Sequence, residues 1–198
     1  MKRPNSSPIG RRPFHVAGGL VLPLAALLGP YWAAQGLAAL ATLTFWSGEV
    51  VRFSNPTFNR WLLGWAGYVF KEHETFRPTG STYLLSASLV VLLFFDRPVA
   101  LLALFFLALS DPVAGVVGQA WGRKQFFGKS WEGGVASFLT GLGVGAALNP
   151  FLPGLSLLLV VVGAGTAAVA ELLPLRLDDN ITVPLFSAGA MALVRAWS

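Results

Sequence analysis

The residues best suited to chemistry lie between positions 110 and 134, where an acidic residue, a glycine strip and a basic turn follow one another. Ala114, Gly118 and Gly122 recur every four residues, which on a helix forms a smooth strip that another backbone or a ligand can approach closely. The segment from Lys129 to Gly133 then opens the next apolar run. The basic residues around the turn are Arg123, Lys124 and Lys129.

Backbone amides at a helix start, combined with lysine and arginine, are suited to binding the phosphates of a nucleotide. Two simpler explanations compete with this one. Helix packing alone would explain the strip of small residues, and a solvated cytoplasmic loop would explain the positive charges.

Carboxylates form the second group of candidates. An ionisable group at membrane depth costs about 2.5 to 3.5 kcal/mol, so each acidic residue in or beside an apolar run is a functional hypothesis. These residues are Glu49, Asp111, Glu132, Glu171, Asp178 and Asp179. Glu49 precedes Arg52 by three positions, so an ordinary ion pair within one helix explains it equally well. The others, with the nearby cations, would suit a site for magnesium and phosphate.

Any metal would have to be held by oxygen or histidine, because the chain contains no cysteine. His15 is also a candidate general base, although a lone histidine near the membrane surface often has no chemical role.

The elements that must position these residues are membrane-spanning helices. Hydrophobic residues make up 55% of the chain and charged residues 12%, and the mean hydropathy is +0.64. We therefore expect an all-α, polytopic integral membrane protein with about six or seven transmembrane helices. The expected spans are 16–34, 36–53, 81–95, 99–121, 133–149, 155–173 and 181–197.

The charge distribution fits a topology with a cytoplasmic amino terminus. All of the 14 Lys and Arg residues except Arg97 and Arg195 then lie on the cytoplasmic side, together with the candidate active-site loops. The positive net charge is thus explained by the membrane topology, and no nucleic-acid partner is needed to explain it. We expect a multi-pass protein of the cell membrane, with a basic cytoplasmic segment at residues 1–15 and a single transmembrane catalytic domain at residues 16–198.

At the residues just described the chain resembles a known family. Asp111-x-x-Ala114-x-x-x-Gly118-x-x-x-Gly122, followed by Lys129-Ser130-x-Glu132-Gly133, resembles the CTP-binding signature of the dolichol kinase, phytol kinase and CTP-dependent diacylglycerol kinase family. Phosphatidate cytidylyltransferase is a more distant relative of that family. Further segments match the pattern in the expected order: "RRPFH" (11–15), "GEVVR" (48–52), "ETFRPTGSTY" (74–83) and "ELLPLRLDDNITVPL" (171–185). The chain departs from the family in having Gly128-Lys129-Ser130 where two lysines and a threonine are common.

The resemblance implies transfer of the γ-phosphoryl group of CTP, with Mg²⁺, to the hydroxyl of a lipid alcohol in the bilayer. It implies catalytic roles for Asp111, Lys129, Glu132, Glu171 and His15, with Glu171 or His15 as base. Nucleotide contacts are implied for Ala114, Gly118, Gly122, Arg123, Lys129, Ser130 and Gly133, and magnesium contacts for Asp111, Asp178 and Asp179. The other matched residues are Arg12, Glu49, Glu74 and Asn180.

Two alternatives are weighed against the kinase. A cytidylyltransferase that makes a CDP-lipid shares the first signature, but its carboxyl-terminal signature has no counterpart here. A small transporter would also use glycine-rich helices and buried carboxylates, but it does not explain the turn before Gly133. Polyprenol, phytol-like alcohols and diacylglycerol all remain possible acceptors, and the sequence carries no code for the acceptor or for an oligomeric state.

Overall fold

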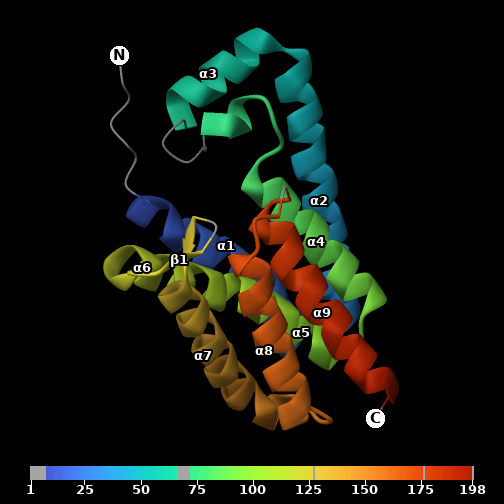
Figure 1. Cartoon of the computed structure of the whole chain (residues 1–198). Helices are drawn as coiled ribbons and strands as arrows, with labels where there is room; N and C mark the ends of the chain where they lie inside the picture. The colour runs from blue at the N-terminus through green and yellow to red at the C-terminus, as the bar shows by residue number, and fades with distance from the viewer. Residues whose placement is uncertain (1–7, 67–71, 127, 176, 198) are drawn as a thin grey trace.

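The computed structural model describes residues 8–66, 72–126, 128–175 and 177–197, and it is 86% helical (Figure 1). Its elements are α1 (Pro8–Leu28), α2 (Tyr31–Ser54), α3 (Pro56–Ala66), η1 (Glu72–Thr75), α4 (Gly80–Phe94), α5 (Arg97–Phe105), η2 (Phe106–Ser110), α6 (Asp111–Trp121), β1 (Gln125–Phe126), β2 (Lys129–Ser130), α7 (Trp131–Leu148), η3 (Asn149–Phe151), α8 (Leu157–Leu172) and α9 (Asp179–Trp197).

Each expected span falls on a helix, but the first two boundaries differ. The chain turns at Gly29 and Pro30, where their residue types favour a hairpin connection, so the expected first span 16–34 extends past the end of α1. Pro30 has an extended backbone and precedes α2, and a residue before proline is disfavoured in a helix, which explains the earlier break. Because α1 begins at Pro8, the expected boundary after residue 15 lies inside a helix.

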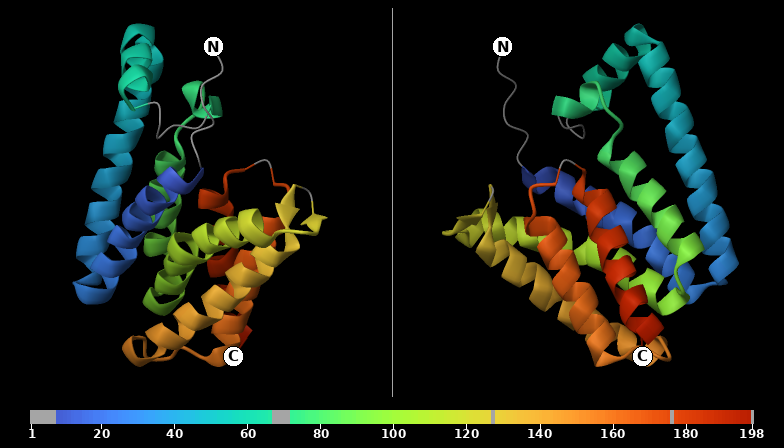
Figure 2. Two further views of the ribbon diagram at one scale, coloured as in Figure 1. Left: turned by 90° about the vertical axis from the view of Figure 1, so that its left-hand side faces the viewer. Right: turned by 45° about the vertical axis from the view of Figure 1, so that its right-hand side comes forward.

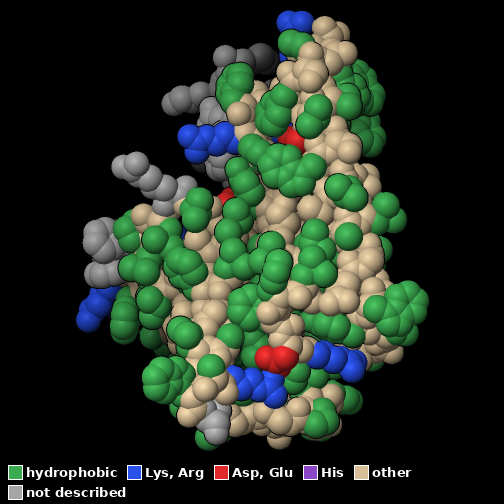
Figure 3. Space-filling model, turned by 90° about the vertical axis from the view of Figure 1, so that its right-hand side faces the viewer, with side chains coloured by type: hydrophobic (Ala, Val, Ile, Leu, Met, Phe, Trp, Pro, Cys, Tyr) green, Lys and Arg blue, Asp and Glu red, His purple; other side chains and the backbone are tan. Residues whose placement is uncertain are grey.

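Two helical runs in the described part are long and apolar enough to cross a membrane, namely Arg97–Trp121 and Trp131–Phe151. Three shorter apolar helices accompany them: Pro13–Leu28, Gly80–Phe94 and Leu157–Leu172. One face of the molecule shows a broad uncharged band, with charged side chains towards its two ends (Figure 3). Large apolar side chains such as Leu40, Leu157 and Leu193 are exposed on the outer helices. These features fit a membrane-associated protein.

The centre of the molecule is the run formed by α5, η2 and α6. Every residue from Val99 to Ala108 is buried, and a helix that is apolar on all sides belongs in a core. In two further views this run is steeply inclined to α7 and α8 (Figure 2). The η2 segment is a π-helix that ends directly before Asp111, and such local widening of a helix is often found at functional sites.

Local signals explain where several helices begin. Thr79, Ser130 and Ser156 each cap a helix by accepting a main-chain N–H from the first turn, at 3.0 to 3.3 Å. The hairpin of β1 and β2, which we did not anticipate, sets Lys129 beside the start of α7. Its turn contains Gly128 with φ +83°, a conformation that favours glycine.

Candidate active site

A cavity of about 560 Å³ opens where α6, the β hairpin and the starts of α7 and α9 meet. It is lined by most of the residues that the sequence singled out, although these come from segments far apart in the chain. The lining residues are His15, Asp111, Pro112, Ala114, Gly115, Gly118, Gln119, Gly122, Gly128, Lys129, Ser130, Gly133, Glu171 and Asp179.

An ion pair crosses this cavity. Lys129 Nζ lies 2.9 Å and 2.8 Å from the two carboxylate oxygens of Asp179, and both side chains are partly exposed. The pair joins β2 to the first residue of α9. In an exposed position such a pair adds little stability, so both groups are available to a ligand of higher charge.

Asp111 and His15 face each other on another wall of the cavity. His15 Nε2 lies 3.6 Å from Asp111 Oδ2 and 3.3 Å from the carbonyl oxygen of Leu107. Leu107 belongs to the π-helical segment η2. His15 therefore contacts both Asp111 and the widened turn that precedes it, which suits a residue that helps to position the carboxylate.

The glycine strip allows α6 and α7 to approach very closely. A Cβ atom added at Gly118 would lie 2.6 Å from Ser130 Oγ, and one added at Gly122 would lie 2.6 Å from Ser130 Cβ. One at Gly133 would lie 2.8 Å from the carbonyl oxygen of Ala114. Ser130 Oγ accepts the Gly133 N–H at 3.0 Å. The strip thus both packs the helices and lines the cavity beside the cap of α7.

Glu171 lies in the last turn of α8 and is only 9% exposed, yet it lines the cavity. Its Oε2 atom has no hydrogen-bond partner in the described part of the chain. A buried carboxylate oxygen without a partner is costly, so this atom is suited to receiving a hydrogen bond from a ligand.

Several predicted residues lie outside the cavity lining. Glu132 is partly exposed and accepts the main-chain N–H of Lys124 at 3.2 Å, so it stabilises the hairpin. Arg123 is exposed beside it. Asp178 Oδ1 accepts the main-chain N–H of Asn180 at 3.0 Å and its side-chain amide at 2.6 Å, which makes it the cap of α9. The side chain of Arg12 lies outside the described residues.

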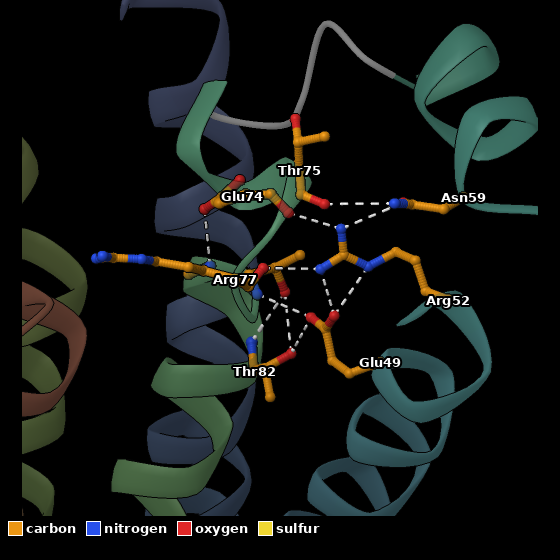
Figure 4. A network of polar contacts seen from close by, with 9 residues as sticks. Glu49, Arg52, Asn59, Glu74, Thr75, Arg77 and Thr82 are labelled. Atoms are coloured by element: carbon orange, nitrogen blue, oxygen red, sulfur yellow. Dashed lines mark hydrogen bonds and ion pairs between the residues drawn. The ribbon is translucent and has the colours of Figure 1, made fainter. Parts of the chain in front are cut away.

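Glu49, Glu74 and Arg52 form a separate buried network (Figure 4). Arg52 donates to Glu49 Oε2 through Nε at 2.9 Å, and also to the main-chain carbonyls of Glu74 at 2.6 Å and Arg77 at 2.8 Å. Glu49 Oε1 accepts the Thr79 N–H at 2.8 Å. Glu49 and Arg52 do form the ion pair within one helix, but they also fix a distant loop.

Two further hydrogen bonds belong to the same network. Glu49 Oε1 also accepts from Thr82 Oγ1 at 2.9 Å, and Glu74 Oε1 accepts the Gly80 N–H at 2.8 Å. These contacts join the end of α2 to η1 and to the start of α4.

Sequence reasoning missed some lining residues. Gln119 and Gly115 lie on the wall of the cavity without having been singled out. They are one turn apart on α6 and adjacent to the strip, so the same spacing of four residues would have found them.

The donor set fits magnesium only with a nucleotide present. In the described part of the chain, no group of three or more His, Cys, Asp or Glu residues is placed to hold a metal ion. The cavity nevertheless offers the carboxylates of Asp111 and Asp179. Magnesium commonly binds through one or two carboxylates and completes its shell with substrate phosphates and water, and this cavity matches that pattern.

The chain is similar to several kinases that act on lipid alcohols. A CTP-dependent diacylglycerol kinase of Schizosaccharomyces pombe is 26% identical over 206 residues, covering 94% of this chain and 93% of that protein. The corresponding kinase of Eremothecium gossypii is 28% identical over 175 residues, and a phytol kinase of Synechocystis is 36% identical over 117 residues. The chain is thus similar to proteins of the CTP-dependent lipid-alcohol kinase family.

The extent of the match differs between these relatives. The alignments cover 76% of this chain and 55% of the Eremothecium kinase, and 54% of this chain and 50% of the phytol kinase. The chain thus spans about half the length of these two relatives. No protein-family model and no solved structure matches the chain.

Proposed function

We propose that this protein is a CTP-dependent kinase that phosphorylates the hydroxyl of a membrane lipid alcohol. The observation that carries the proposal is the cavity itself, where Lys129, Asp179 and Asp111 meet beside the capped start of α7. Family members named for CTP-dependent diacylglycerol kinase and phytol kinase activity support the same reaction.

The polyphosphate of CTP fits between the hairpin and the glycine strip. Lys129 would donate to its phosphates from β2, while Gly118 and Gly122 let Ser130 and the start of α7 pack against α6 and so shape the wall of the cavity. Asp111 and Asp179 would hold Mg²⁺, which neutralises the phosphate charge when bound. On this proposal, Lys129 exchanges its ion pair with Asp179 for a contact to phosphate.

Glu171 is the proposed general base. Its buried, unpartnered oxygen would accept the proton of the lipid hydroxyl while that oxygen forms a bond to the γ-phosphorus. The bond from the γ-phosphorus to the bridging oxygen of the β-phosphate breaks, and CDP leaves. His15, which contacts Leu107 and Asp111, would position Asp111 and is the second candidate for the base.

The lipid acceptor would reach the cavity from the bilayer. We propose that seven helices cross the cell membrane, namely α1, α2, α4, the run from α5 to α6, α7, α8 and α9, with the amino terminus and the hairpin on the cytoplasmic side. Diacylglycerol, a phytol-like alcohol and a polyprenol each place a hydroxyl at the membrane surface, so all three belong in the assay.

The test is an incubation of the purified protein with a mixed lipid extract and CTP labelled either at the α or at the γ phosphorus. A kinase transfers only the γ label to lipid and releases CDP. A cytidylyltransferase would transfer the α label and release pyrophosphate, and a transporter would label no lipid. Transfer of the α label, or unlabelled lipid with every acceptor, would refute the proposal. The Asp111→Asn variant serves as the inactive control.

A further inference from the structure

The buried network of Glu49, Arg52 and Glu74 fixes a loop without using the side chain of Arg77. Arg52 is 2% exposed and Glu49 is 4% exposed, and Arg52 binds the main-chain carbonyl of Arg77 at 2.8 Å. The fork of a guanidinium has rigid geometry, so this contact defines the position of that peptide. Burying charges costs free energy, and such networks are often kept because they specify one conformation.

The guanidinium of Arg77 is left exposed by this arrangement. Figure 4 shows its side chain extending away from the network, on the side opposite to α2. Within the described residues, no acidic side chain forms an ion pair with it. The network therefore presents a cation whose charge is not used by the fold.

This loop lies beside the candidate active site. A Cβ atom added at Gly80 would lie 3.0 Å from Asn180 Nδ2. Asn180 directly follows Asp179, which lines the cavity and binds Lys129. Gly80 is itself held by Glu74 at 2.8 Å. Arg77 is thus only three residues from a point of contact with the helix that carries Asp179.

The charges that line the cavity leave room for another cation. Lys129 is the one Lys or Arg among the lining residues of the described chain, while Asp111, Glu171 and Asp179 are acidic. A nucleoside triphosphate brings about four further negative charges, and arginine binds phosphate in a bidentate manner that lysine cannot match.

We propose that Arg77 is a further nucleotide-binding residue, which contacts the polyphosphate and is held in place by Arg52. This inference rests on the proposed function, because it takes CTP as the ligand. Arg52 acts as a positioning residue, since it contacts the peptide of Arg77 and is not aimed at the cavity.

The experiment measures CTP binding by calorimetry for the purified protein in nanodiscs of phosphatidylcholine. Arg77→Gln should weaken CTP binding about tenfold or more, since it removes a charge-assisted contact, and Arg77→Lys should weaken it less. Arg60→Gln is the matched control, because Arg60 is an exposed arginine on α3, and its CTP affinity should stay within twofold of the wild type. An Arg77→Gln variant within twofold of the wild type would overturn the inference.

Two comparisons distinguish a failure of the proposed function from a failure of this inference, and a nucleotide contact from a lipid contact. If the wild type does not bind CTP, the proposed function fails and this inference fails with it. If the wild type binds CTP and Arg77→Gln binds it equally tightly, only the inference is refuted. The titrations are repeated with phosphatidylglycerol in the nanodiscs. An effect of Arg77→Gln that appears only with this anionic lipid would assign the residue to a lipid headgroup and overturn the nucleotide contact.

The positioning role of Arg52 is tested by a double-mutant cycle. Arg52→Gln should weaken CTP binding in the wild-type background but add less than twofold to Arg77→Gln. Thr82→Val, which removes one hydrogen bond to Glu49 and one to the Thr79 hydroxyl, serves as a second, milder variant if Arg52→Gln does not fold. Losses of affinity that multiply in the double variant would show that Arg52 does not act through Arg77, and this result would overturn its positioning role.

Discussion

Lys129 Nζ contacts both carboxylate oxygens of Asp179 across the candidate active site, at 2.9 Å and 2.8 Å. A residue proposed to bind phosphate and a residue proposed to bind magnesium thus neutralise each other before any ligand arrives. Nucleotide and metal together would replace this pair by two new contacts, so their binding should be coupled.

Substitution of Lys129 tests whether this residue leaves Asp179 to bind the phosphates of the nucleotide. Lys129→Gln should abolish most CTP binding and activity while leaving the protein folded in detergent, because it removes a charge aimed at phosphate and not a packing group. It should also leave magnesium binding without nucleotide equal to or tighter than in the wild type, because Asp179 loses its competitor. Both affinities are measured by calorimetry, and wild-type turnover in the variant would refute the site.

Asp178 and Asp179 are adjacent but should respond differently to substitution. Magnesium should bind the wild type far more tightly with CTP than without it, and Asp179→Asn should weaken this nucleotide-dependent binding markedly. Asp178→Asn is the matched control. Asp178 caps α9, and asparagine caps a helix about as well as aspartate, so this variant should leave both the free energy of unfolding and the metal affinity close to the wild type. Tight magnesium binding without nucleotide would contradict the coupling.

The close contact of α6 and α7 predicts a strong effect at Gly118. Gly118→Ala would place a Cβ atom 2.6 Å from Ser130 Oγ, which must shift and give up its cap on α7. We expect a loss of about 1–3 kcal/mol in the free energy of unfolding together with weaker CTP binding. Gly143→Ala is the control, since nothing lies within 4 Å of the added atom. Equal unfolding temperatures of the two variants would disprove this packing.

Glu171 should affect the chemical step more than nucleotide binding. Glu171→Gln keeps the size of the side chain but removes the base, so kcat should fall about 100-fold or more while the Kd for CTP changes by less than about threefold.

His15→Gln should instead weaken nucleotide-dependent magnesium binding, because His15 contacts Asp111. Full turnover by Glu171→Gln together with its loss in His15→Gln would transfer the role of base to His15.

The proposed topology predicts the accessibility of two turns. Tags at the amino terminus and in the loop at 122–132 should report the cytoplasm, whereas a tag at 149–154 should report the opposite side. Protease protection of intact membranes provides the measurement. Finding the loops at 122–132 and 149–154 on the same side would overturn the topology.

The sequence by itself determined the helices, the resemblance to a kinase family and most lining residues of the cavity. Apolar runs, capping residues such as Ser156 and the spacing of Gly118 and Gly122 are local signals, because hydrogen bonds and side-chain faces within a helix depend on near neighbours. The predicted resemblance to this kinase family was confirmed by the relatives that the chain matches. The ion pair of Glu49 and Arg52 was likewise readable from a spacing of three residues.

Only the tertiary structure decided which residues meet. Lys129 and Asp179 are 50 positions apart in the chain, so no local pattern predicts that they pair. No local pattern predicts that Asp178 and Asp179 have different roles either. The two roles differ because of where α9 begins. Asp178 is the cap and accepts a hydrogen bond from the first turn, whereas Asp179 is the first residue of the helix and contacts Lys129. Helix packing likewise brings His15 to Asp111 and places the loop of Arg77 beside Asn180, since these contacts depend on how α1, α4, α6 and α9 fill space together.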